Sequence, residues 1–170
     1  GTRAVPELCR SIVQTGVRRV LVVTDVGLVK LGMVDRVTTT LRDAGAEVWV
    51  YDGVEPDPTF AQCEAGVHRI MEHRCDGVLA LGGGSPMDAA KVIAALATNH
   101  KPVKKLVGMF KLRQAPLPLF AIPTTAGTGS EATIVAVATD TAATAKAFFI
   151  DPKLIPCMAA LDASLMTGLP

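Results

Sequence analysis

Hydrophobic residues follow two alternating patterns along most of this chain. Short runs rich in β-branched residues, such as 19–24, are typical of strands buried on both faces of a parallel sheet. Between them, apolar residues recur at helical spacing, as at Leu8, Ile12 and Val13. The patterns predict strands over residues 19–24, 47–51, 77–81 and 118–122, and helices over residues 4–14, 34–44, 58–74 and 86–98. Such alternation predicts an α/β fold, with a doubly wound, mostly parallel, Rossmann-like sheet.

The pattern changes after Pro123. Residues 133–139 and 145–150 read as two strands joined by a short polar turn, which predicts a C-terminal β-hairpin. A short strand is expected at 158–161 and a helical turn at 164–168. The connections are short, so residues 1–170 are expected to form one domain. The chain begins and ends abruptly, and we therefore expect a domain truncated at both ends.

Composition narrows the classes of function. Apolar residues make up 49% of the chain, which is enough for a core, and the net charge is only +1. Basic residues do not interleave with aromatic ones, so nucleic acid is not an expected partner. Apolar runs have the length of strands and no signal peptide is visible, so no membrane association is expected. The four cysteines form no C-x-x-C pair and are expected to be buried, reduced thiols of a cytoplasmic protein: Cys9, Cys63, Cys75 and Cys157.

A glycine triplet after the third predicted strand is the first candidate site. Glycines permit positive φ and close approach of a ligand. Ser85 is placed to cap the next helix, Pro86 suits its first position, and Asp88 could complete a variant capping box. The N–H groups and dipole of that helix would bind an anion, most naturally a pyrophosphate. The candidate residues are Gly82, Gly83, Gly84, Ser85, Pro86 and Asp88. Lys91 lacks the P-loop position, which disfavours nucleoside triphosphate hydrolysis.

Two more candidates follow predicted strands. Asp25 lies at the carboxyl end of the first strand, where it could accept ribose hydroxyls; equally, it could cap the next helix through Gly27 and Leu28. Segment 123–131 offers threonine and serine hydroxyls for ribose, phosphate or an amide, and could instead be a connector with its own turn bonds. The histidines show no spacing of a helical metal site, and His68 and His73 are expected to face solvent.

Two glycine-rich segments together resemble the iron-containing (group III) alcohol dehydrogenase family. They are Gly82-Gly83-Gly84-Ser85-Pro86-Met87-Asp88 and Pro123-Thr124-Thr125-Ala126-Gly127-Thr128-Gly129-Ser130-Glu131. Segments 23–25, 51–59 and 161–165 also match, so the resemblance covers nearly the whole chain.

That resemblance implies an N-terminal NAD(P)-binding α/β domain and an all-helical domain that carries Fe²⁺, or Zn²⁺ in some members. The helical domain is expected to be absent from this chain. It implies that Gly83 to Asp88 hold the pyrophosphate and that Asp25 holds the adenosine ribose, which favours NAD over NADP. The further cofactor contacts that it implies are Thr124, Thr125, Thr128, Lys146, Leu165 and Asp57, the last standing where many members have asparagine. No catalytic or metal residue is expected within the chain.

The function implied is hydride transfer between NAD and an alcohol or aldehyde by an intact, homo-oligomeric enzyme. The chain alone is expected to bind dinucleotide weakly without turning over alcohol. Two alternatives stay open from the sequence: a dehydroquinate-synthase-like lyase, which also places a glycine triplet after its third strand, and a non-catalytic nucleotide-binding module. The wording of segment 124–131 fits the dehydrogenases better than the lyases.

Overall fold

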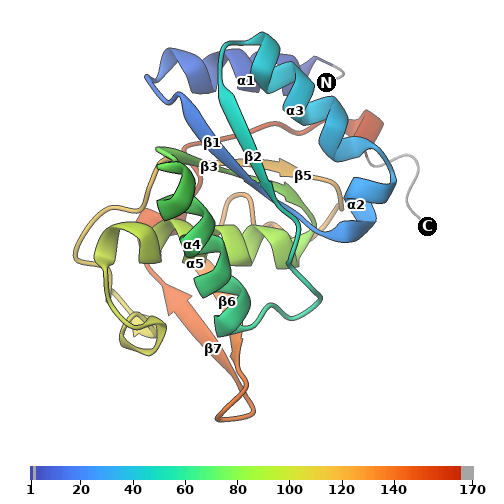
Figure 1. Cartoon of the computed structure of the whole chain (residues 1–170). Coiled ribbons are helices and arrows are strands. Elements are labelled where there is room, and N and C mark those ends of the chain that lie inside the picture. The colour runs from blue at the N-terminus through green and yellow to red at the C-terminus, as the bar shows by residue number, and fades with distance from the viewer. Residues whose placement is uncertain (2, 166–170) are drawn as a thin grey trace.

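A central sheet lies between two layers of helices (Figure 1). The computed structural model describes residue 1 and residues 3–165. The predicted turn at 164–168 lies partly outside the described residues, and its described beginning belongs to a 3-10 helix, η3 (Ala163–Leu165).

The main sheet has five parallel strands in the order β2-β1-β3-β5-β8, which confirms the doubly wound α/β prediction. Its strands are β1 (Arg19–Val23), β2 (Glu47–Tyr51), β3 (Gly77–Gly82), β5 (Leu119–Pro123) and β8 (Met158–Ala159). Every residue of β3 and β5 is buried, because helices cover both faces of the sheet. Burial on both faces explains why the sequences of these strands are continuous apolar runs.

Helices cover both faces of this sheet. The three on one side are α1 (Ala4–Gln14), α2 (Val26–Lys30) and α3 (Met33–Asp43); the two on the other are α4 (Phe60–His73) and α5 (Gly84–Asn99). Two separate apolar cores result, one on each side of the sheet. Helix α2 was not predicted, because its five residues are too few to show a helical period.

The predicted hairpin is confirmed and belongs to a second sheet. Strands β6 (Val135–Asp140) and β7 (Ala145–Ile150) pair antiparallel, and the short β4 (Gly108–Met109) joins β7. Ala136, Ala138 and Phe149 pack into the core beneath α5. This sheet therefore lies against the helix that begins at the glycine triplet. Two further 3-10 turns are η1 (Val103–Lys105) and η2 (Pro152–Leu154).

Two predictions about single side chains were wrong. Cys157 is exposed, whereas Cys9, Cys63 and Cys75 are buried free thiols. Cys157 directly precedes β8, an edge strand, so no layer covers it. His73 does not simply face solvent, because its ring stacks on Trp49 with 5.0 Å between ring centroids. Within the described residues, no helix combines the length and the apolar character that crossing a membrane requires.

Candidate functional site

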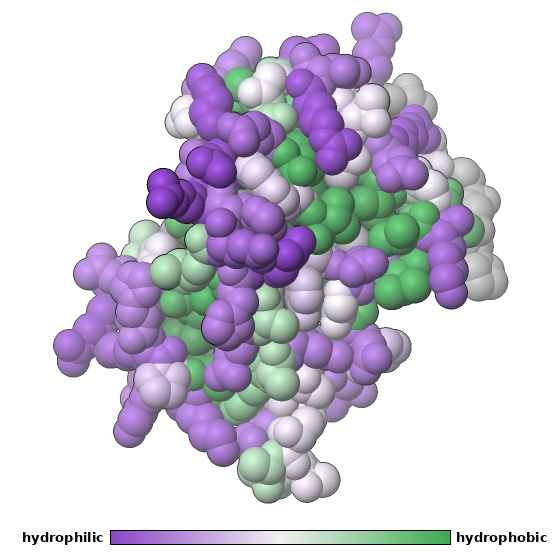
Figure 2. Space-filling model, viewed as in Figure 1, coloured by the Kyte–Doolittle hydropathy of each residue, from purple (hydrophilic) through white to green (hydrophobic). Residues whose placement is uncertain are grey.

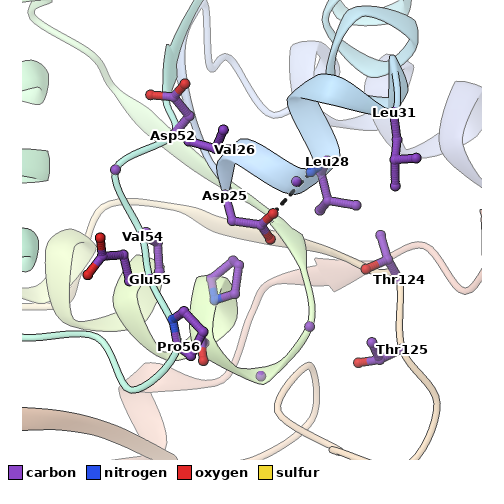
Figure 3. Close-up of a pocket in the computed structure, with 16 residues that line it drawn as sticks. Asp25, Val26, Leu28, Leu31, Asp52, Val54, Glu55, Pro56, Thr124 and Thr125 are labelled. Carbon is purple, nitrogen blue, oxygen red and sulfur yellow. Dashed lines mark hydrogen bonds between the residues drawn. The ribbon is translucent and has the colours of Figure 1, made fainter. Parts of the chain in front are cut away.

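Three neighbouring strands end at one edge of the main sheet, and the chain there encloses a cavity of about 640 Å³ (Figure 3). Asp25 follows β1, Gly83 follows β3 and Thr124 follows β5. The connections leaving β1 and β3 pass to opposite faces of the sheet, so a crevice opens between their carboxyl ends. The cavity is lined by Asp25, Val26, Gly27, Leu28, Leu31, Asp52, Gly53, Val54, Glu55, Pro56, Gly83, Gly84, Ser85, Pro86, Thr124 and Thr125.

The turn from β3 into α5 differs from its predicted form. Gly83 is the N-cap residue in an extended conformation, α5 begins at Gly84, and no side chain caps it. Ser85 and Pro86 therefore take the second and third helical positions, and the prediction of a Ser85 cap was wrong. Pro86 is tolerated there because the first-turn N–H groups of a helix have no internal partner. Of the triplet only Gly82 has a positive φ, 148°, and a Cβ there would lie 2.6 Å from Cγ of Pro86.

The missing cap leaves the start of α5 available to an anion. A Ser or Asp cap would have occupied the N–H groups of the first turn. Instead, the N–H groups of Gly84 and Ser85 have no partner within the helix. The helix is 16 residues long, so its dipole places positive partial charge at this turn. The local chemistry is that of a phosphate site.

The structure brings the second glycine-rich segment against this turn. A Cβ on Gly83 would lie 3.1 Å from Oγ1 of Thr125, and one on Gly84 would lie 3.6 Å from Cγ2 of Thr128. The N–H of Thr124 donates to the carbonyl oxygen of Gly82 at 3.0 Å. Oγ1 of Thr125 is buried and has no hydrogen-bond partner among the described residues. A buried hydroxyl left unpaired beside unpaired amides fits a polar ligand such as a nucleotide phosphate.

Asp25 caps the next helix, as one interpretation of its position predicted, and it also lines the cavity. Its Oδ1 accepts the N–H of Leu28 at 3.0 Å and so caps α2. The carboxylate also lines the cavity, opposite Thr124 and Thr125 (Figure 3). One oxygen of the carboxylate can therefore hold the helix while the group faces the cavity.

Two carboxylates of this cavity were missed by the sequence reasoning. Asp52 and Glu55 follow the end of β2 and line the cavity with Asp25, and no lysine or arginine is among its described lining residues. Their position within four residues of the end of a strand was the available signal. The walls near α2 are apolar: Figure 2 shows hydrophobic surface there, with Val26 48% and Leu31 61% exposed. The cavity thus combines an apolar wall with a negative rim.

A second cavity of about 370 Å³ lies on the other side of the start of α5. It shares Gly84 and Ser85 with the first and extends to the β6–β7 hairpin. Its lining is Asp57, Pro58, Gly84, Ser85, Asp88, Val137, Ala138, Thr139, Lys146 and Phe148. Nζ of Lys146 lies 2.8 Å from Oδ1 of Asp57. The start of α5 is therefore flanked by two spaces, as a ligand with two halves joined by phosphates would need.

Asp88 does not complete a capping box, and that prediction was wrong. Its two oxygens instead accept hydrogen bonds from Oγ of Ser130, at 3.3 Å, and from the N–H of Val137, at 3.1 Å. Burial raises the pKa of Asp88, partly offset by these bonds. The side chain is drawn to β6 because the helix start lies against the hairpin rather than in solvent. Asp88 thereby joins α5 to the segment after β5.

Lys91 takes a position that the sequence did not reveal. It is fully buried, and its Nζ donates to the carbonyl oxygens of Thr133 and Val135 at 2.8 and 2.9 Å and to Oγ1 of Thr133 at 3.0 Å. Burial lowers the pKa of Lys91 to about 8. Lys91 lies one turn after Asp88 in α5, and like Asp88 it joins α5 to the segment after β5.

Three of the predicted contact residues lie elsewhere. Gly82 and Thr128 adjoin the loop but are not lining residues of either cavity, and Thr128 is exposed. Leu165 is 3% exposed and packs in the core formed with α1 and α3. Among the described residues, no group of three or more His, Cys, Asp or Glu side chains could hold a metal. A metal therefore does not fit the residues described.

Comparison with known proteins decides the family. The sequence model for iron-containing alcohol dehydrogenases matches residues 1–163. The chain belongs to the iron-containing alcohol dehydrogenase family. This assignment agrees with the resemblance of the two glycine-rich segments and favours the dehydrogenases over the lyase alternative.

Curated relatives of the family align along the whole chain. It is 38% identical over 170 residues to alcohol dehydrogenase 4 of Schizosaccharomyces pombe, covering 100% of the chain and 40% of that protein. It is 37% identical over 170 residues to the NAD-dependent methanol dehydrogenase of Bacillus methanolicus, covering 100% of the chain and 45% of that protein. The chain thus spans less than half the length of these relatives.

Solved structures of the family share the fold. A 1,3-propanediol oxidoreductase superposes with a TM-score of 0.97 at 35% identity, covering 100% of this chain and 44% of that chain. The sulfoacetaldehyde reductase from Bifidobacterium kashiwanohense, in complex with NAD⁺, gives a TM-score of 0.92 at 30% identity, covering 100% and 45%. The Rossmann-like architecture is therefore the N-terminal architecture of this family.

Proposed function

We propose that this chain binds NAD across the two cavities and that the protein containing it transfers hydride between NAD and a small alcohol or aldehyde. The observation that carries the proposal is the uncapped start of α5, which faces the unpartnered hydroxyl of Thr125. A relative in complex with NAD⁺ and the name of an NAD-dependent relative support the choice of cofactor.

Different residues of the chain would bind the pyrophosphate, the adenosine half and the nicotinamide half of the dinucleotide. Gly83, Gly84 and Ser85 would hold the pyrophosphate through backbone N–H groups, and the hydroxyl of Thr125 would donate a hydrogen bond to it. The larger cavity would take the adenosine half, with Val26 and Leu31 beside the base. Asp25 would accept the ribose hydroxyls there.

The nicotinamide half would extend toward the second cavity, near Lys146 and Asp57. Thr124 and Thr128 are proposed as further contacts at the turn. When bound, NAD supplies the hydride acceptor or donor. The chain's part is to bind and orient it.

Charge favours NAD over NADP. Three carboxylates line the larger cavity, and its described lining holds no lysine or arginine to neutralise a 2′-phosphate. Like charges brought together cost several kcal/mol, so NADP should bind at least about tenfold more weakly, a difference of about 1.4 kcal/mol.

For the intact protein we propose a metal, iron or zinc, as the family resemblance implies. The described residues offer no site for it, so no step is derived through it. The chain alone is proposed to bind dinucleotide without oxidising alcohol. A cytoplasmic location, which the buried free thiols fit, and a homo-oligomeric state are likewise proposals.

Isothermal titration of the chain with NAD, ADP-ribose and NADP tests the proposal. NAD and ADP-ribose should compete for one site, and NADP should bind more weakly than NAD. Gly83→Val should abolish binding while leaving the far-UV circular dichroism unchanged, because its side chain would extend toward Thr125. Absence of heat and of competition at millimolar ligand would contradict the proposal.

A further inference from the structure

Asp57 is held in an unusual conformation at the edge of the second cavity. Its φ is 56°, in the left-handed region where Asn and Asp are enriched among non-glycine residues. The segment is attached to β6: the N–H of Thr139 donates to the carbonyl oxygen of Pro58 at 2.7 Å, and Thr59 forms a bridge with Thr139. The main chain therefore fixes where the Asp57 side chain begins.

The partner of Asp57 stands on the neighbouring strand. Lys146 of β7 pairs in register with Thr139 of β6, so the lysine and the Asp57 segment lie at the same rung of the hairpin. Nζ of Lys146 lies 2.8 Å from Oδ1 of Asp57. Among the described lining residues of this cavity, Lys146 is the only lysine, arginine or histidine.

The other acid of this cavity cannot take that role. Both oxygens of Asp88 already accept hydrogen bonds, from Ser130 and Val137. The Asp57–Lys146 pair, by contrast, is open to solvent, with side-chain exposures of 69% and 57%. An exposed pair of this kind is weak and exchanges partners readily.

We propose that Asp57 sets the affinity for the cofactor by competing with its phosphates for Lys146. In the free protein Lys146 is paired with Asp57; in the complex the ammonium turns to the anion at the start of α5, which Gly84 and Ser85 bring to the same cavity. The free energy needed to break the Asp57–Lys146 pair lowers the affinity for the dinucleotide, and re-forming the pair speeds release of the dinucleotide. This inference rests on the proposed function, because the competing anion is the dinucleotide.

Asp57→Asn tests the competition. Asparagine tolerates the left-handed conformation and keeps the shape, but it removes the charge. NAD should bind about two- to five-fold more tightly to D57N, the factor expected for one exposed ion pair, and high salt should reduce this gain. Lys146→Met should weaken NAD binding, and D57N should add nothing in the K146M background.

The hairpin offers a matched control. Asp140 directly follows Thr139 in β6, and its Oδ2 lies 2.8 Å from Nζ of Lys104. Neither Asp140 nor Lys104 is a lining residue of the second cavity. Asp140→Asn should leave NAD affinity unchanged. If wild type binds NAD but D57N binds it equally or less tightly, the competition is overturned and the proposed function stands. If no variant binds NAD or inorganic pyrophosphate, both are overturned.

Discussion

The ammonium of Lys91 donates a hydrogen bond to the carbonyl oxygen of Thr133 at 2.8 Å, from a side chain that has no exposed surface. The contact joins the middle of α5 to the end of the segment that carries Thr124 and Thr125. Asp88 makes the parallel connection to Val137. The turn from β3 into α5 is therefore held to the segment after β5 by side chains that lie further along the helix.

Replacing Lys91 with methionine should destabilise the fold by about 1–3 kcal/mol at neutral pH, because the partly buried carbonyl groups of Thr133 and Val135 lose their donor. The effect should also depend on pH. Burial lowers the pKa of Lys91 to about 8 from 10.5, so between these values the unfolded chain binds more protons than the folded one. This residue's contribution to the free energy of unfolding therefore rises with pH from about 8 to 10.5.

Urea denaturation of wild type and K91M from pH 7 to 10 measures both effects. The difference in unfolding free energy should widen above pH 8. Lys105→Met, at an exposed position, is the control and should leave a constant difference. Parallel pH profiles for wild type and K91M would contradict the assignment.

Gly82→Ala should destabilise the chain by about 2 kcal/mol or more and weaken NAD binding. The residue has φ of 148°, and an added Cβ would lie 2.6 Å from the Pro86 ring. Gly45→Ala is a suitable comparison, because Gly45 also has a positive φ, 102°, but nothing within 4 Å of the added Cβ. Thermal unfolding should show the larger loss for G82A; equal losses would show that the clash with Pro86 is relieved.

Substitutions at Asp25 should separate its two roles. Asp25→Asn keeps an oxygen for the N–H of Leu28, so stability should stay within about 0.5 kcal/mol, whereas Asp25→Ala should cost about 1 kcal/mol. Both remove the charge from the cavity and should narrow the preference for NAD over NADP. Calorimetric titration of both cofactors measures this, and an unchanged preference in D25N would assign selectivity to Asp52 and Glu55 instead.

The cysteines should differ sharply in reactivity with a thiol reagent such as DTNB. Burial raises the pKa of Cys9 and Cys75 to about 11 and that of Cys63 to about 12, so these thiols are both shielded and protonated. Cys157 is exposed and should react first. In the native protein one thiol should react rapidly and all four should react in denaturant; Cys157→Ser should remove the rapid phase. A second rapid thiol would contradict the burial described.

Most of the sheet and the helices could be predicted from local patterns. The β6–β7 hairpin was placed within two residues, and β2 and β7 matched their predicted ranges. Helix α2 and strand β4 were not predicted, since five and two residues carry no readable period. Strand β4 exists only because it pairs with β7, which follows it by almost forty residues.

The candidate site also has features that local sequence predicted and features that it did not. The glycine triplet, Asp25 and the threonines were found because each directly follows an apolar run that forms a strand, and parallel strands end at one edge. The roles of Ser85 and Asp88 were misassigned: α5 begins at Gly84, before the predicted Ser85 cap, and the fold gives Asp88 distant partners in place of local capping. Val137, which donates to Asp88, lies 49 residues away along the chain.

The sequence by itself determined the alternation of strands and helices, the positions of the two glycine-rich turns and the family resemblance, all of which can be read from the residues of short continuous segments. Tertiary structure decided that α5 starts uncapped, that Lys91 is buried and that Lys146 meets Asp57. These features arise where segments from different layers meet, and burial and partner geometry there depend on the packing of the whole chain.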